Sequence, residues 1–282
     1  MAPIIRAKLG VADQDYAMTT RPGEAQEIAA TAAEYDVVVA CGGDGTVHEV
    51  VNGLMSIPAD QRPALAIVPT GSGNDTCRTT HIPLDVAEAC DVVLAGHRHR
   101  FDLGKCNGVY FNNSMSVGLD AIVSVKSEVW KKRLSLAGIP LYGFTALDVI
   151  FNELRPFKIT LTIDGGEPFT GEYFIVAVTN GKTYGSGMAV NPHATPDDGK
   201  LTVAMVTPVS KLETFGLFGK LLSGTIDTAP TYSWRDVSTI SIQVHGGPVP
   251  RGTDGEVDHG DHFEITTEPG AIEMIVPATH WS

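Results

Sequence analysis

A strand pattern that runs directly into a glycine-rich turn constrains the fold of this chain more than any other feature. Residues 35–55 read Tyr-Asp-Val-Val-Val-Ala-Cys-Gly-Gly-Asp-Gly-Thr-Val-His-Glu-Val-Val-Asn-Gly-Leu-Met. Tyr35–Ala40 is apolar and β-branched like a buried strand, Gly42–Gly45 is a turn, and Val47–Met55 has the apolar spacing of a helix. This order of elements is typical of α/β folds with a parallel sheet.

The same arrangement recurs once. Ala64–Pro69 predicts a second buried strand, Thr70–Asp75 a second glycine-rich turn, and Pro83–Ala95 a helix. A further helix is predicted before the first strand, over Thr20–Glu34. Because parallel strands end at one edge of their sheet, both turns are expected at the edge where α/β proteins bind ligands.

The pattern changes after residue 100. Short apolar runs separated by Gly, Asp, Asn and Pro predict strands over Phe101–Cys106, Tyr110–Met115, Phe157–Asp164, Tyr173–Thr179, Leu201–Val206, Val237–Val244 and His262–Thr267. Two helical insertions are predicted, over Ala121–Glu153, with a break near Gly138 and Pro140, and over Lys211–Leu222. We therefore predict an α/β nucleotide-binding domain over residues 1–100 and a mostly antiparallel β-rich substrate domain over 101–274, with a tail at 275–282 that can return to the first domain.

Composition excludes several classes of protein. The chain has 282 residues, 43% of them hydrophobic, and a formal net charge of −13, which opposes nucleic-acid binding. Its apolar runs are strand-sized, and the N-terminus lacks a secretory signal pattern, so the cytoplasm is the expected location. The four cysteines have no metal-ligand spacing and are expected to be reduced.

Both turns have the chemistry of a phosphate site. Glycines allow the backbone to approach phosphate closely, and the N-terminus of the following helix favours negative charge. Asp44 would repel a bare polyphosphate, so it suggests a magnesium ion between carboxylate and phosphate; the alternative is that Asp44 only caps the helix. In the second turn Thr70, Ser72, Asn74 and Asp75 offer hydrogen bonds or metal contacts.

Two common nucleotide motifs are absent from the sequence. No Gly-x-x-x-x-Gly-Lys-[Ser/Thr] occurs, so the chain is not a P-loop NTPase. Neither turn completes Gly-x-Gly-x-x-Gly, which disfavours a dinucleotide dehydrogenase.

Four segments in order resemble the diacylglycerol kinase catalytic family, which includes sphingosine kinases, ceramide kinases and bacterial lipid kinases. They are GGDGTVHEVVNGL, PTGSGND with Arg78 shortly after, NGKTYGSGMAVNPHATPDDGKL, and TDGE at Thr253–Glu256. The resemblance implies an N-terminal Rossmann-like, three-layer domain similar to NAD kinases and phosphofructokinases, joined to a C-terminal, mostly antiparallel β-sandwich-like domain. It also implies a phosphotransferase of phospholipid metabolism.

The resemblance implies roles for particular residues. Asp44 and Asp75 would bind magnesium and ATP, and Glu256 would be the general base, with Asp254 beside it. Asp198 would hold a structural magnesium with carbonyls near Thr195 and Lys200. The nucleotide would be bound by Gly42, Gly43, Gly45, Thr46, Thr70, Gly71, Ser72, Gly73 and Asn74.

The resulting hypothesis is an ATP-dependent lipid kinase that uses Mg²⁺ and phosphorylates a lipid hydroxyl, with diacylglycerol as the favoured acceptor and phosphatidic acid as its product. The basic residues Lys126, Lys131, Lys132 and Arg133 around Trp130 suggest transient contact with the inner membrane surface, although a solvated helix face explains them equally well. Pairing into a homodimer is left open.

Two alternatives remain open. One is a small-molecule kinase of the NAD kinase type, which shares a Gly-Gly-Asp-Gly turn. The other is a truncated, catalytically silent nucleotide- or lipid-binding member. Members of the resembling family usually begin with a strand and an Asn-Pro-x-Ser-Gly turn, which this chain lacks, so its first strand and one wall of the nucleotide pocket are expected to be missing.

Overall fold

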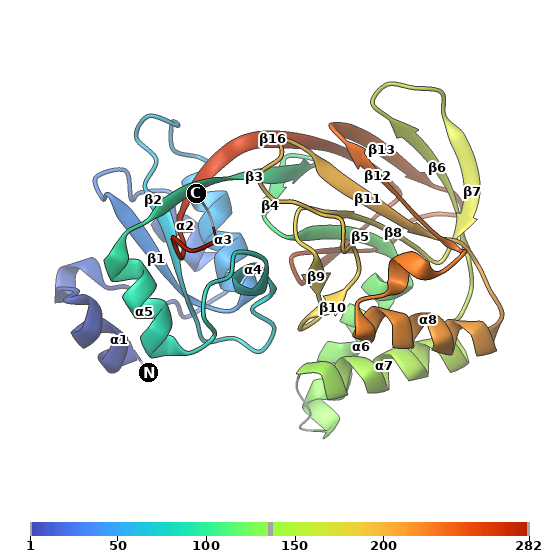
Figure 1. Cartoon of the computed structure of the whole chain (residues 1–282), viewed down its shortest axis with the longest axis horizontal. Helices are drawn as coiled ribbons and strands as arrows, with labels where there is room; N and C mark the ends of the chain where they lie inside the picture. The colour runs from blue at the N-terminus through green and yellow to red at the C-terminus, as the bar shows by residue number, and fades with distance from the viewer. Residues whose placement is uncertain (1, 135–137, 281–282) are drawn as a thin grey trace. The chain divides into compact units, whose positions relative to one another are not determined.

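The computed structural model describes residues 2–134 and 138–280, and it divides into two compact units. Unit 1 comprises Met1–Phe101 with Gly270–Ser282, and unit 2 comprises Asp102–Pro269. Two strands, β3 (Arg98–Cys106) and β16 (His262–Ile275), begin in one unit and end in the other, so the chain passes between the units twice in extended conformation (Figure 1).

Unit 1 is an α/β structure. Its parallel strands β1 (Val37–Gly42) and β2 (Ala64–Pro69) pair in register from Val37 opposite Ala64 to Gly42 opposite Pro69. The end of β16 joins β2 in parallel, with Met274 opposite Leu65. The helices are α1 (Ala2–Leu9), η1 (Asp13–Asp15), α2 (Glu24–Ala29), α3 (Asp44–Leu54), α4 (Asp75–Thr79) and α5 (Val86–Ala95).

Apolar side chains hold these helices on the sheet. Val92 and Val93 of α5 pack against Ala64 and Ala66 of β2. Helix α3 lies close to α2 because Gly53 has no side chain at the contact, where a Cβ would overlap the carbonyl oxygen of Gln26. Glu49 of α3 also accepts hydrogen bonds from the N–H groups of Gly23 (2.8 Å) and Ala25 (3.0 Å), which caps the start of α2.

The sequence prediction of a helix over Thr20–Glu34 is too long. Only Glu24–Ala29 is helical, because Pro22 and Gly23, the latter with φ of 81°, form a turn ahead of it. The short helix α4 was not predicted, and residues 2–9 form a helix instead of the strand with which the resembling family begins.

Unit 2 is a β-sandwich with helices on one side. Its first sheet has the antiparallel order β12-β11-β8-β5-β14-β15, and its second contains β7, β6, β13 and the start of β16. The strands are β4 (Val109–Phe111), β5 (Ser114–Gly118), β6 (Phe157–Ile163), β7 (Phe169–Tyr173), β8 (Ile175–Thr179), β9 (Thr183–Tyr184), β10 (Met188–Ala189), β11 (Leu201–Val206), β12 (Tyr232–Val237), β13 (Thr239–Val244), β14 (Val249–Thr253) and β15 (Glu256–Gly260).

The sandwich core follows the two-residue period of its strands. Met115 and Val117 of β5 point into the core, where they meet residues of the second sheet such as Ile159 and Ile242. The intervening residues Ser114 and Ser116 therefore face the opposite side of the first sheet.

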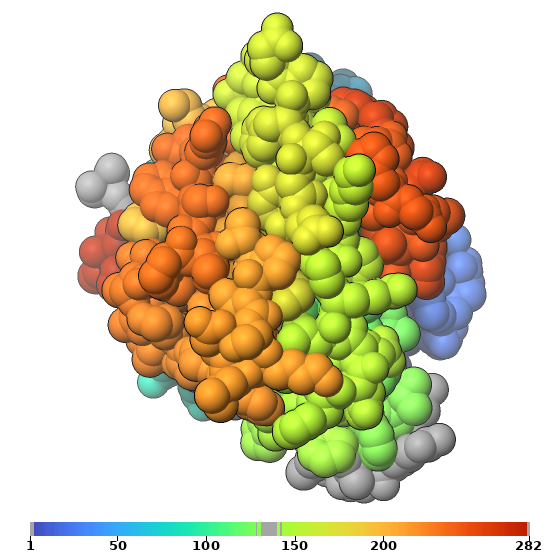
Figure 2. Space-filling view, turned by 90° about the vertical axis from the view of Figure 1, so that its right-hand side faces the viewer, coloured from blue at the N-terminus to red at the C-terminus, as the bar shows by residue number. Residues whose placement is uncertain are grey.

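Helices α6 (Leu119–Leu134), α7 (Gly138–Asn152) and α8 (Lys211–Ser223), with the short η2 (Ile226–Thr228), cover that opposite side. Figure 2 shows green α7 beside orange α8 on this face, and the rings of Phe151 and Phe215 lie 5.5 Å apart between them. Helix α8 begins with a capping box in which Ser210 and Glu213 exchange hydrogen bonds.

The predicted architecture is confirmed, with local corrections in unit 2. The single strand predicted over Tyr110–Met115 is two strands, because the chain turns at Asn112 and Asn113. The hairpin of β14 and β15 was not predicted, since its glycine, proline and charged residues lack an apolar run. No helix in the described parts of the chain is long and apolar enough to cross a membrane.

Candidate functional site

The two glycine-rich turns touch each other in unit 1. A Cβ on Gly43 would lie 3.0 Å from the Cα of Gly71, and a Cβ on Gly71 would overlap the Cα of Gly43. The N–H of Thr70 donates to the carbonyl of Gly42 at 2.9 Å, which continues the strand pairing into the turns. Glycine is therefore required at both positions by close backbone approach.

Two predicted carboxylates converge beside these turns. A Cβ on Gly73 would lie 2.6 Å from Asp44 Oδ2 and 3.5 Å from Asp75 Oδ2, so both acids lie around the same glycine. Asp44 begins α3 and also accepts a hydrogen bond from the N–H of Thr76 at 3.2 Å. Asp75 begins α4 and is 5% exposed.

The remaining predicted nucleotide residues lie in the same turns. Gly45 and Thr46 are in the first turn of α3, and Thr46 packs against Gly42. Ser72 is exposed in the loop before α4. Asn74 has φ of 53°, its amide donates to the carbonyl of Gly71 at 2.9 Å, and its buried Oδ1 has no hydrogen-bond partner in the described structure. That oxygen remains available to a ligand.

The predicted acids Asp254 and Glu256 lie on the hairpin of β14 and β15 in unit 2. Asp254 and Gly255 both have positive φ, 47° and 94°, as a two-residue hairpin turn requires. The Asp254 carboxylate is buried and accepts the N–H groups of Asn112 (3.0 Å), Asn113 (3.0 Å) and Ser114 (2.9 Å). Glu256 is exposed at the start of β15.

A buried polar network supports the loop that carries Asp198. Asp102, 2% exposed, accepts the N–H of Gly199 at 2.6 Å and donates its own N–H to Pro196 at 2.8 Å. Asn180 donates to the carbonyl of Asp102 at 2.7 Å. Asp198 accepts the N–H of Lys200 at 3.0 Å, and partial burial raises the pKa of its carboxyl.

The two predicted metal positions offer different sets of candidate ligands. Within residues 2–134 and 138–280, no three His, Cys, Asp or Glu side chains form a metal-binding group. The carboxylates of Asp44 and Asp75 around Gly73 match the coordination preference of Mg²⁺. This ion often binds one or two carboxylates and completes its coordination shell with substrate phosphates and water. Asp198 would depend on backbone carbonyls for the rest of its ligands.

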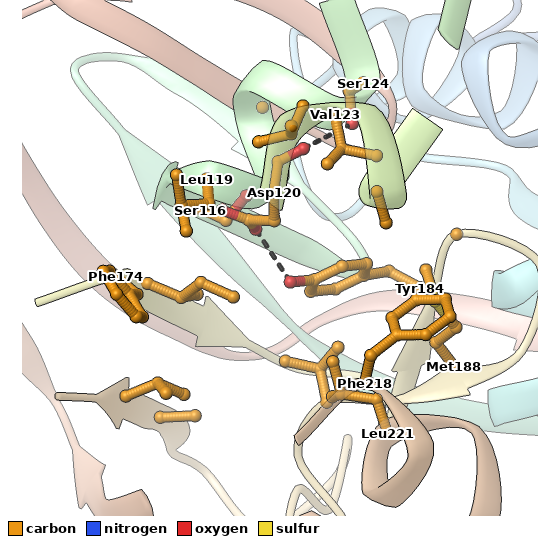
Figure 3. A pocket seen from close by; sticks show the side chains of 18 of the residues that line it. Ser116, Leu119, Asp120, Val123, Ser124, Phe174, Tyr184, Met188, Phe218 and Leu221 are labelled. Atoms are coloured by element: carbon orange, nitrogen blue, oxygen red, sulfur yellow. Dashed lines mark hydrogen bonds between the residues drawn. The ribbon is translucent and has the colours of Figure 1, made fainter. Parts of the chain in front are cut away.

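An apolar pocket of about 140 Å³ lies in unit 2 between the first sheet and the three helices. Figure 3 shows Val123 of α6 on one wall and Phe218 and Leu221 of α8 on another. Ala204 and Val206 of β11 belong to the strand side. The pocket also reaches the hairpin, because Gly252, Asp254 and Gly255 line it.

One end of this pocket is polar. The hydroxyl of Tyr184 donates to Asp120 Oδ2 at 2.7 Å near Ser116 (Figure 3). Ser114 also lines the pocket. Burial raises the pKa of the Asp120 carboxyl. Burial, together with the adjacent carboxylate, raises the pKa of Tyr184 well above its usual value.

The sequence analysis assigned no role to Asp102, Asp120, Asn180 or Tyr184, although Asn180 and Tyr184 lie in one of the four segments that carry the resemblance. Asp102 had a signal, since it is a charged residue inside an apolar strand pattern. Asp120 and Tyr184 are 64 residues apart, and nothing local in the sequence shows that they meet.

An α/β unit with paired glycine-rich turns and a separate β-sandwich unit define a class of proteins with the NAD kinase type of fold. An NAD kinase from Archaeoglobus fulgidus in complex with ATP has this fold: its TM-score is 0.53 at 13% identity, over 99% of this chain and 90% of that one. A diacylglycerol kinase structure from Bacillus anthracis str. Sterne is more similar, with a TM-score of 0.75 at 28% identity over 93% and 85% of the two chains.

Sequence comparison narrows the class. Residues 5–106 match the model of the diacylglycerol kinase catalytic domain, and residues 113–276 match the YegS C-terminal NAD kinase beta sandwich-like domain. The chain is 32% identical to a diacylglycerol kinase from Staphylococcus saprophyticus, over 83% of this chain and 75% of that protein. It is 30% identical to a Yersinia pestis protein named "Probable lipid kinase YegS-like", over 92% and 86%. The chain belongs to the diacylglycerol kinase family, in its YegS-like lipid kinase branch.

Proposed function

We propose that this protein transfers the γ-phosphate of ATP to the hydroxyl of a lipid, with diacylglycerol as the favoured acceptor. The observation that carries the proposal is the apolar pocket of unit 2, which extends to the hairpin where Glu256 is located. An apolar lining suits acyl chains, and family membership supports a phosphotransferase.

The turns of unit 1 are the proposed site for ATP. Phosphate oxygens would accept hydrogen bonds from the backbone of the two turns and from the side-chain NH2 of Asn74, which has a second hydrogen besides the one donated to Gly71. Asp44 and Asp75 would hold Mg²⁺, which neutralises phosphate charge when it is bound. The bare carboxylates would otherwise repel the nucleotide.

Glu256 is the proposed general base. It is exposed at the start of β15, so its carboxylate is accessible to take the proton of an attacking hydroxyl. Asp254 has a supporting part in this proposal: its carboxylate accepts three backbone N–H groups and fixes the turn that presents Glu256. We therefore treat Asp254 as a positioning residue.

Transient membrane contact is proposed at helices α7 and α8. Phe144, Leu147 and Phe151 recur at three- and four-residue spacing on α7 and are exposed, and Leu212 at the start of α8 is 81% exposed. The side chains of Lys131, Lys132 and Arg133 lie outside the described residues. A homodimer and the structural magnesium at Asp198 stay predictions.

A kinase assay with a substrate panel tests the proposal. The purified protein is incubated with magnesium, γ-labelled ATP and micelles of several lipid alcohols, with NAD as a separate acceptor. We expect label in lipid, and we expect it to be lost in Asp44→Asn. Label in NAD instead would identify a small-molecule kinase, and no transfer to any acceptor would identify a silent member.

Glu256→Gln tests the general base. We expect kcat to fall by about 100-fold or more with unchanged affinity for ATP, because the variant keeps the shape of the side chain and loses only its ability to take a proton. Asp261→Asn, an exposed acid just after β15, is the matched control and should keep wild-type turnover. Wild-type kcat in Glu256→Gln would exclude this role.

A further inference from the structure

The polar end of the pocket contains a hydrogen-bond acceptor without a donor. Asp120 Oδ2 accepts from the hydroxyl of Tyr184 at 2.7 Å, but Asp120 Oδ1 is buried and has no hydrogen-bond partner among the described residues (Figure 3). A buried acceptor without a partner costs folding free energy, so a ligand that supplies a donor at this point would be stabilised.

The charge of the lining restricts that ligand. No Lys, Arg or His is among the described residues that line the pocket. The nearest cation along α6, Lys126, is paired with Asp148 (2.8 Å) and Glu153 (2.6 Å). The other lining carboxylate, Asp254, already accepts three backbone N–H groups. An anionic headgroup would therefore meet two acids and no basic side chain on these walls.

We propose that Asp120 is the residue that selects the lipid: its Oδ1 accepts a hydrogen bond from the hydroxyl of an uncharged lipid alcohol as the lipid enters the pocket. The same hydroxyl gives up this bond before it donates its proton to Glu256 during transfer. This inference rests on the proposed lipid kinase function and specifies its substrate class. Lipids with a phosphate headgroup are disfavoured, because the acids that attract a hydroxyl repel a phosphate.

Two further features of the site agree with this selection. The hydroxyls of Tyr184 and Ser116 both hydrogen-bond to the Asp120 carboxylate, that of Tyr184 at Oδ2. Asp120 is therefore oriented before a ligand enters. The raised pKa of Asp120 shows that its surroundings disfavour an isolated charge, a penalty that a hydrogen bond from a ligand hydroxyl reduces.

Direct binding measurements test the proposal without depending on catalysis. We would titrate the whole protein by calorimetry with three micellar lipids of equal chain length: dioctanoylglycerol, the propanediol diester that lacks its hydroxyl, and dioctanoyl phosphatidylglycerol. The wild type should prefer dioctanoylglycerol to each of the other two by about tenfold or more. In Asp120→Leu the preference over the propanediol diester should disappear.

Val123→Ala is the matched control, because Val123 lies on the same helix and lines the same pocket with an apolar side chain. It should weaken binding of dioctanoylglycerol and of the propanediol diester by the same factor and leave their ratio unchanged. Equal affinity of the wild type for these two lipids would overturn the proposal even if Asp120→Leu failed to fold. Tighter binding of phosphatidylglycerol, or an unchanged ratio in folded Asp120→Leu, would overturn it as well.

The kinase assay separates this inference from the proposed function. Selective, Asp120-dependent binding without transfer of label would leave the binding role intact and refute the kinase activity. Equal phosphorylation of dioctanoylglycerol by the wild type and Asp120→Leu would support the kinase activity and refute the role of Asp120.

Discussion

Asp254 and Glu256 are two residues apart in the sequence, but they have different environments. Asp254 is 5% exposed and accepts three backbone N–H groups, whereas Glu256 is exposed. At the residue scale, burial and hydrogen bonding thus distinguish an acid that maintains the structure from one that remains available for chemistry.

Asp254→Asn should lower the free energy of unfolding by about 1–3 kcal/mol, because an amide has one acceptor oxygen and leaves a buried N–H without a partner. Urea denaturation of Asp254→Asn beside Glu256→Gln measures this difference. Glu256→Gln should remain within about 0.5 kcal/mol of wild type. Equal stability of both variants would show that the hydrogen bonds of Asp254 do not support the hairpin.

Gly71→Ala should weaken ATP binding by about tenfold or more, because its Cβ would overlap Gly43 and force the two turns apart. Calorimetric titration with magnesium and ATP gives the affinity, and circular dichroism reports the fold. Gly216→Ala on α8 serves as the control, since a Cβ there meets nothing within 4 Å. Normal affinity in Gly71→Ala would mean that the contact of the turns does not shape the nucleotide site.

At the scale of elements, strands that are buried on both faces were predicted best. Ala64–Pro69 and Leu201–Val206 are buried at every position, and both predictions match the observed strands residue for residue. A short apolar run is recognised from the sequence alone, whereas β14 and β15 contain a proline, two glycines and several charged residues and have no apolar run. These two strands pair with each other, and β14 also pairs with β5, so their formation depends on contacts that the local sequence does not show. The pocket as a whole could not be assembled from local patterns, since its walls come from elements that are distant in the sequence.

Helix α8 offers a test of local helix propensity. Gly216 and Gly219 lie in its interior, and a Cβ added at either would meet no atom within 4 Å, so each change to Ala should raise the free energy of unfolding by about 0.5–1 kcal/mol. Gly224 follows the last residue of the helix and has φ of 71°. Gly224→Ala should therefore lower the free energy of unfolding by about 1 kcal/mol. Thermal unfolding of the three variants gives the sign of each change in the free energy of unfolding. The same sign at all three positions would contradict the assigned end of α8.

At the scale of the whole molecule, charge and exposed apolar surface act in opposite directions. The net charge of −13 repels an anionic membrane, while Phe151, 60% exposed, and Leu212, 81% exposed, favour insertion into a lipid surface. The net charge is read directly from the sequence, but the exposed apolar surface could not be predicted from it, because the exposure of α7 and α8 depends on how unit 2 packs.

Binding to vesicles that contain phosphatidylglycerol should therefore increase when salt is raised from about 0.01 M to about 1 M, as the Debye length falls from roughly 30 Å to 3 Å. Co-sedimentation measures the bound fraction. Binding to uncharged phosphatidylcholine vesicles should change little, and Phe151→Ser with Leu212→Ser should weaken both. Salt-induced release from anionic vesicles would instead indicate attraction through a local basic surface.

The alternation along β5 has a consequence for how this protein can diverge. Met115 and Val117 belong to the sandwich core, and Ser114 and Ser116 line the pocket. Inheritable changes at alternate positions can therefore alter the preferred lipid without disturbing the core, so new substrate ranges can arise by single substitutions in a retained fold. An inserted residue would turn the core side chains of β5 towards the pocket and the pocket side chains towards the core, which would impair both. Divergence along this strand should therefore proceed by replacement and not by change of length.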